Sequence, residues 1–105
     1  MTRTVRTQMV LAVVFSLASA ACFAQSSGQA TYKAKCQTCH GAAGTPSPGM
    51  AKMMGIKPVS DPAIKALTAE QMFTAAKNGR GKMKPVTGLT DSEIKDAVAF
   101  YRGLN

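Results

Sequence analysis

The feature of this sequence that most restricts its fold is the short run of residues 36–40, which reads Cys-Gln-Thr-Cys-His. A Cys-x-x-Cys-His pattern is the signature of covalent haem attachment. One turn of α-helix takes about 3.6 residues, so Cys36 and Cys39 lie on one face and can each form a thioether with a haem vinyl group. His40 follows directly and can bind the iron through a ring nitrogen. The run therefore predicts one covalent haem held by Cys36, Cys39 and His40.

Other uses of two closely spaced cysteines fit this chain less well. A Cys-x-x-Cys pair also occurs in thioredoxin-like redox motifs and in zinc sites. A redox pair of that kind belongs in a strand-helix-strand unit, and the sequence shows no strand pattern. A structural zinc site needs four ligands, yet residues 25–105 contain no Cys or His outside the run. A disulfide would leave the adjacent His40 without a role, so haem attachment is the favoured prediction.

Residues 1–24 have the layout of a secretory signal peptide. A basic start that contains Arg3 and Arg6 precedes an apolar run over residues 9–15. Cys22 and Ala24 place small residues at positions −3 and −1 of a cleavage site. We expect cleavage after Ala24, a periplasmic location, and one haem-binding domain over residues 25–105. Haem is attached to such motifs outside the bacterial cytoplasm, so the export signal and the motif agree.

Two other fates of the N-terminus stay open. An uncleaved segment would anchor the protein in the membrane, although the apolar stretch is shorter than the about 20 residues that a membrane helix needs. Lipidation at Cys22 is disfavoured because Ser19 stands where a lipoprotein signal has an apolar residue. We therefore expect no stable membrane insertion once the signal has been removed.

The predicted mature chain is small, with 81 of the 105 residues. A chain of this size buries little apolar surface and usually needs a disulfide, a metal or a cofactor for stability. Haem would form the centre of the core here, so we expect the apoprotein to be largely unfolded.

The mature chain is also basic. It carries 9 Lys and 2 Arg against 5 Asp and Glu, a formal net charge of +6. Positive surfaces attract nucleic acid, anionic membranes or acidic proteins. Export argues against nucleic acid, and the sequence has neither a helix with clustered basic residues nor an aromatic stacking platform. We therefore expect redox partner proteins with an acidic docking surface, and no nucleic acid.

The remaining patterns predict an all-α fold of about four to five short helices. Thr68 and Gln71, like Thr90 and Glu93, have the spacing of a capping box at the start of a helix. Behind Thr90, apolar residues recur at i, i+3, i+4 and i+7 and form one stripe. The predicted helices run from Ser26 or Ser27 to Cys39 and over residues 50–54, 61–66, 68–78 and 90–102.

Two further patterns accompany the haem motif. Gly28 and Tyr32 precede it on the first predicted helix, and residues 78–83 read Asn-Gly-Arg-Gly-Lys-Met. Together with the motif, they make the chain resemble the small class I monohaem cytochromes c of the bacterial periplasm. The resemblance covers nearly the whole mature chain. It implies a few helices wrapped around an edge-exposed haem, with Gly28 allowing a close crossing by a C-terminal helix that offers Phe100 and Tyr101.

The same resemblance implies that the glycine-rich loop delivers a methionine as the sixth iron ligand. Met83 is the residue at that place, and it follows His40 by 43 residues. The sequence departs from the family pattern in one respect, because Lys84 separates Met83 from Pro85 where the family has Met-Pro. We expect a loop that is less rigid than usual or shifted by one residue. Met72 is expected in the core, and the alternative sixth ligands are Met50, Met53 and Met54.

The surroundings of His40 are also predicted. A histidine that binds a metal usually donates its second ring N–H to a carbonyl or a carboxylate. By the resemblance, the carbonyl of Pro46 or Pro48 is the expected acceptor. Tyr32 and Tyr101 are expected to pack in the helix crossing and not to relay electrons.

Ligation by His40 and Met83 would leave the iron no vacancy for oxygen, peroxide or substrate. The methionine thioether raises the reduction potential of such a centre. We therefore expect a monomeric periplasmic carrier of one electron that is not an enzyme. Three alternatives stay open. They are a haem subunit or domain docked to a membrane oxidase or dehydrogenase, a protein in which a labile Met83 yields to gas or peroxide, and Cu(I) binding by Met50, Met53 and Met54.

Overall fold

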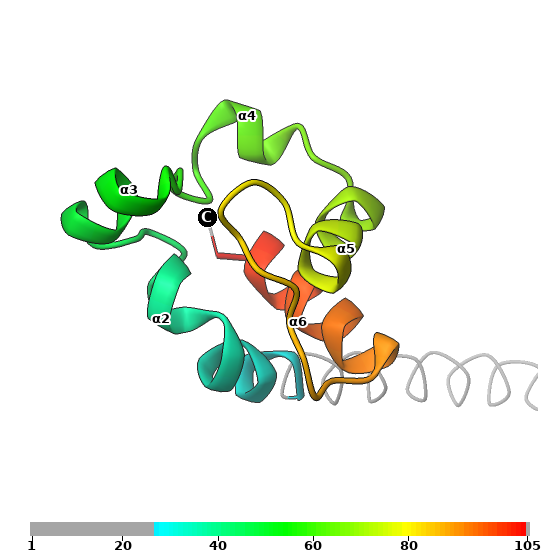
Figure 1. The fold of residues 1–105 in the computed structure, drawn as a ribbon. Helices are drawn as coiled ribbons and strands as arrows, with labels where there is room; N and C mark the ends of the chain where they lie inside the picture. The colour runs from blue at the N-terminus through cyan, green and yellow to red at the C-terminus, as the bar shows by residue number, and fades with distance from the viewer. Residues whose placement is uncertain (1–26, 105) are drawn as a thin grey trace, which may run out of the picture.

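The computed structural model describes residues 27–104, and these residues are helical with short connections (Figure 1). The predicted signal peptide of residues 1–24 lies outside the described residues. An N-terminal helix covers 27–35. It is followed by α2 (Gln37–His40), α3 (Pro48–Met54), α4 (Pro62–Lys65), α5 (Ala69–Asn78) and α6 (Asp91–Arg102). The described part of the chain forms no strand beyond an isolated bridge between Arg80 and Met83, so the all-α prediction is confirmed.

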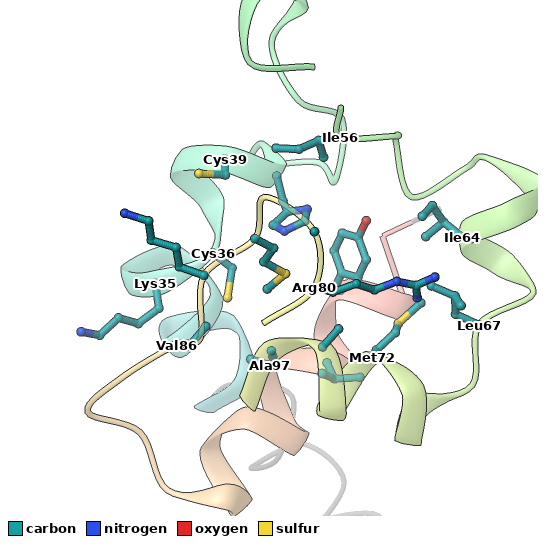
Figure 2. A pocket seen from close by; sticks show the side chains of 18 of the residues that line it. Lys35, Cys36, Cys39, Ile56, Ile64, Leu67, Met72, Arg80, Val86 and Ala97 are labelled. Carbon is teal, nitrogen blue, oxygen red and sulfur yellow. The ribbon is translucent and has the colours of Figure 1, made fainter. Parts of the chain in front are cut away.

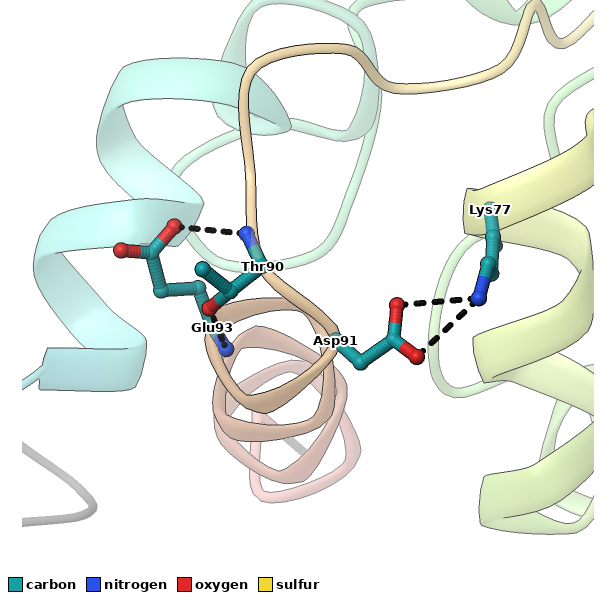
Figure 3. A network of polar contacts seen from close by, with 4 residues as sticks. All are labelled: Lys77, Thr90, Asp91 and Glu93. Carbon is teal, nitrogen blue, oxygen red and sulfur yellow. Dashed lines mark hydrogen bonds and ion pairs between the residues drawn. The ribbon is translucent and has the colours of Figure 1, made fainter.

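The helix starts follow the capping residues that the sequence offers. Thr68 caps α5, where its hydroxyl accepts from the Gln71 N–H at 3.1 Å and the Gln71 side chain accepts from the Thr68 N–H at 2.9 Å. Thr90 and Glu93 make the same reciprocal pair at the start of α6 (Figure 3). Each capping box satisfies two backbone donors that the helix itself leaves unpaired. Both predicted capping boxes are therefore confirmed.

The first predicted helix is interrupted at the haem motif. The N-terminal helix ends at residue 35, and α2 begins at Gln37 with Cys36 as its N-cap. The chain nevertheless continues in helical hydrogen bonding, because the Cys36 N–H donates to the Tyr32 carbonyl at 2.9 Å and the His40 N–H donates to the Cys36 carbonyl at 3.0 Å. The motif thus lies on a short helical turn of its own.

The N-terminal helix crosses α6 at very short range. A Cβ atom built on Gly28 would collide with the carbonyl group of Asp96, so the crossing requires a residue without a side chain. One turn further on, the Tyr32 ring is 2% exposed and lies 5.3 Å from the ring centroid of Phe100. Tyr32 also stacks on Tyr101 at 5.9 Å. The close crossing and its aromatic partners are as predicted.

Helix α6 supplies most of the buried core. Ile94, Ala97 and Val98 are buried on the face that the apolar stripe predicted. On its exposed side, Asp91 pairs with Lys77 of α5 at 3.0 Å (Figure 3). Exposed ion pairs of this kind contribute little stability, so the joint between α5 and α6 depends mainly on apolar packing.

Candidate haem-binding site

The helices surround a cavity of about 680 Å³, and Figure 2 shows many of the side chains that line it. This volume lies within the range of about 300–1,000 Å³ that is typical of cofactor sites. Most of the side chains around it are apolar, and they include Ile56, Ile64, Leu67, Met72 and Val86. Five cations also line the cavity, whereas no Asp or Glu among the described residues does. These cations are Lys35, Lys57, Arg80, Lys82 and Lys84.

Cys36 and Cys39 both line this cavity and are half-buried. They are free thiols, so the structure does not show the disulfide alternative. Burial, with a smaller contribution from neighbouring Cys39, raises the pKa of the Cys36 thiol and keeps it protonated. Both cysteines are thus free thiols on the wall of one mainly apolar cavity, where each can form a thioether with a vinyl group.

His40 lines the same cavity and presents a neutral ring. Burial lowers its pKa, which favours the uncharged imidazole that binds metals. The Tyr101 ring packs edge-on against the imidazole at 5.4 Å. The neighbouring peptide is also held, because the Tyr32 hydroxyl donates to the Gly41 carbonyl at 2.6 Å. The orientation of His40 is thus restricted from two sides.

The Nδ1 atom of His40 is buried and has no hydrogen-bond partner in the structure. The predicted bond to the carbonyl of Pro46 or Pro48 is therefore wrong. The resemblance supplied that acceptor, and sequence alone gives no measure of where the carbonyls of a proline-containing loop point. A buried ring nitrogen without a partner is costly, so it marks His40 as a residue placed for a role other than packing.

Met83 lies on the cavity wall at the end of a tight turn. The N–H of Arg80 donates to the Met83 carbonyl at 2.9 Å, and the N–H of Met83 donates to the Arg80 carbonyl at 2.9 Å. Gly79 and Gly81 have φ values of 81° and 58°, a region that glycine adopts without strain. The turn is therefore closed by two reciprocal backbone bonds, and the expectation that Lys84 makes the loop less rigid or shifts it by one residue stays a prediction.

The other methionines divide into two groups. Met54 and Met72 line the cavity with Met83, whereas Met50 and Met53 do not. Met53 points outward and is 61% exposed. Met54 is therefore the one member of the alternative methionine cluster that lies at the site.

The structure thus brings Cys36, Cys39, His40 and Met83 together around one cavity. Two free thiols, a neutral imidazole with an unsatisfied nitrogen, a thioether and apolar walls can together hold a covalent haem, so the residues fit it. Within residues 27–104 no three His, Cys, Asp or Glu side chains converge on a metal site, which counts against the zinc alternative. Sequence reasoning missed how Tyr101 packs on His40, and it did not separate Met54 from Met50 and Met53.

Comparisons with known proteins give two similarities. Residues 23–100 match the family described as cytochrome c oxidase, cbb3-type, subunit III. The chain is also similar to the solved structure of the KustC0563 c-type cytochrome, with 29% sequence identity and a TM-score of 0.65 over 73% of this chain and 95% of that one. None of the curated proteins matches the sequence. Among residues 27–104, no helix is long and apolar enough to cross a membrane.

Proposed function

Since this chain belongs to the family of cytochrome c oxidase, cbb3-type, subunit III, and is a c-type cytochrome domain, we propose that it transfers single electrons between proteins on one haem c. Haem c supplies an iron that accepts and releases one electron when it is bound. The observation that supports one haem at this place is the convergence of Cys36, Cys39, His40 and Met83 on a single cavity.

Each of the four residues has a distinct role in this proposal. Cys36 and Cys39 attach the cofactor through thioether bonds, and His40 binds the iron through its neutral imidazole. Met83 would supply a thioether sulfur to the iron, and such a ligand raises the reduction potential. If His40 and Met83 both bind the iron, no site remains for a substrate, so the domain would act as a carrier and not as an enzyme.

The charges around the cavity suggest the partner. Lys82 and Lys84 flank Met83 on the cavity wall, and Lys52 lies beside exposed Met53 on α3. By contrast, three of the chain's five acidic residues lie on α6, away from the cavity lining: Asp91, Glu93 and Asp96. The partner therefore presents an acidic surface to this part of the cavity rim, formed by residues 52–57 and 80–84 and here called the cavity mouth. Attraction of opposite charges speeds association at low salt, and weak redox encounters bury less than about 1,200 Å².

The place of action follows from the N-terminus. Residues 1–24 act as a signal peptide that is removed, and the domain over residues 25–105 works in the periplasm as a monomer. An uncleaved N-terminus would instead hold the domain at the membrane.

The family description favours a second candidate function. Subunit III of a cbb3-type oxidase is a component of a larger complex, so the domain would then be docked to an oxidase and deliver electrons within it. The native mass of the protein after periplasmic extraction separates the two. A mass near that of one chain supports the free carrier, and recovery with a membrane complex supports the subunit.

A matched pair of variants tests the proposed ligation. Met83→Ala should abolish the methionine-to-iron absorption band in the red, lower the reduction potential and admit carbon monoxide to the reduced protein. Met54→Leu changes a methionine on the same wall and should retain the band and exclude carbon monoxide. If Met54→Leu removed the band and Met83→Ala did not, Met54 would be the ligand. A wild-type protein without the band would contradict methionine ligation altogether.

A further inference from the structure

One polar contact joins two distant parts of the cavity mouth. The Nζ of Lys82 donates to the main-chain carbonyl of Met53 at 2.9 Å, across a sequence separation of 29 residues. Lys82 belongs to the turn that carries Met83, and Met53 lies in the last turn of α3. The contact therefore connects two segments of the cavity wall, the end of α3 and the turn of Met83.

On the α3 side, the helix has little else to hold it. None of the residues of α3 is buried, and a Cβ atom at Gly49 or Gly55 would meet nothing within 4 Å. The last carbonyls of a helix lack partners within the helix, and the negative end of its dipole attracts a cation. The Lys82 ammonium meets both needs at the end of α3. The next residues along the chain, Met54 and Ile56, line the cavity.

On the other side, the turn transmits the restraint to Met83. The reciprocal bonds between Arg80 and Met83 make residues 80–83 one closed unit. Lys82 is the residue just before Met83 in this unit. Its side-chain hydrogen bond to α3 therefore limits how far the unit can move away from the cavity.

We propose that Lys82 is a positioning residue, whose hydrogen bond to the Met53 carbonyl holds the Met83 turn across the cavity mouth and slows the displacement of Met83 by small external ligands. This inference rests on the proposed function, since it assumes that Met83 is the axial donor. It gives the Met83 turn a restraint in a loop where Lys84 stands at the place of the expected proline. It also separates the role of Lys82 from the general positive charge of the rim.

Lys57 offers the matched control. It is an exposed lysine that lines the same cavity, as Lys82 does, but it makes no contact with α3 comparable to the bond at Met53. Lys57→Gln and Lys82→Gln remove the same charge from the same mouth, and Lys82→Gln alone removes the bond. Lys82→Arg keeps both the charge and a donor at the end of a long side chain.

The experiment measures the rate at which imidazole displaces Met83 in the oxidised holoprotein, followed by loss of the methionine-to-iron band. Removing one exposed hydrogen bond should speed displacement in Lys82→Gln by about threefold. Lys57→Gln should match the wild type, and Lys82→Arg should restore most of the wild-type rate. Equal rates in the two glutamine variants, or no change in Lys82→Gln, would overturn the proposal.

The same samples distinguish rejection of the Lys82 proposal from rejection of the proposed function. A pyridine haemochrome spectrum reports covalent haem, and the red band reports methionine ligation in the wild type. If either is absent, the proposed function fails before the variants are compared. If both are present and Lys82→Gln exchanges as slowly as Lys57→Gln, only the role of Lys82 is rejected.

Discussion

The two sides of the cavity are built in different ways. Where the N-terminal helix crosses α6, backbones touch at Gly28, and the Tyr32 ring is almost completely buried. At the mouth, α3 buries no residue, and the Met83 turn is closed by backbone bonds and joined to α3 by an exposed lysine. Apolar packing resists change, whereas a few exposed bonds can be altered at small cost. The crossing should therefore determine stability, and the mouth should determine ligand exchange and partner recognition.

The largest effect is expected from removal of the cofactor attachment. The two sides face each other across a cavity of about 680 Å³ with apolar walls, and so small a chain has little other core. The double variant Cys36→Ala, Cys39→Ala should be largely unfolded. Thermal unfolding followed by circular dichroism checks this, and a cooperative transition in that variant would show that the helix crossing folds by itself.

A pair of glycine substitutions compares the two sides directly. Gly28→Ala places a methyl group against the Asp96 carbonyl and should lower the free energy of unfolding by about 2 kcal/mol. Gly49→Ala on α3 meets no atom within 4 Å and should raise the free energy of unfolding by about 0.4–1 kcal/mol. Denaturant unfolding of both holoproteins measures the difference. Equal losses would remove the distinction between a tight crossing and a loose mouth.

The lysines at the mouth should matter for association and not for stability. Replacement of Lys52, Lys82 and Lys84 by glutamine should slow electron transfer to an acidic partner by about tenfold at low salt. Stopped-flow kinetics at increasing ionic strength checks the cause, because the rate of the wild type should fall and that of the variant should change little. A wild-type rate that is flat or rises with salt would contradict steering by these charges.

The smallest effect is expected at the ion pair between Lys77 and Asp91. Both side chains are about half exposed, so solvent screens their attraction. Lys77→Gln should change the free energy of unfolding by less than about 0.5 kcal/mol. If Lys77→Gln lowered the free energy of unfolding as much as Gly28→Ala does, the packing of α5 on α6 would depend on charge.

Local signals made much of the fold predictable. The capping boxes at Thr68 and Thr90 place two helices, because each acts on its own neighbours in the chain. The resemblance to c-type cytochromes, drawn from the haem motif and the loop before Met83, is confirmed by the family match. Short-range patterns suffice where the interaction is itself short-range.

The start of α3 is a local miss, and the other two misses involve contacts over longer distances. The sequence places α3 at residues 50–54, but Ser47 caps it, and it begins at Pro48 inside a segment that reads as a loop. The bond from Lys82 to Met53 joins residues 29 apart, and no local pattern marks it. The expected acceptor for His40 failed for the same reason, since carbonyl directions in a loop depend on the whole fold. The assignment of Cys36, Cys39, His40 and Met83 to one haem remains a prediction.

A redox titration followed by optical spectra tests that prediction most directly. The protein recovered from the periplasm should carry one covalent haem per chain and show a single one-electron transition between spectra typical of histidine and methionine ligation. Loss of the haem on denaturation in acid and organic solvent would contradict attachment through Cys36 and Cys39. A second transition, or spectra without a methionine ligand, would contradict one haem closed by His40 and Met83.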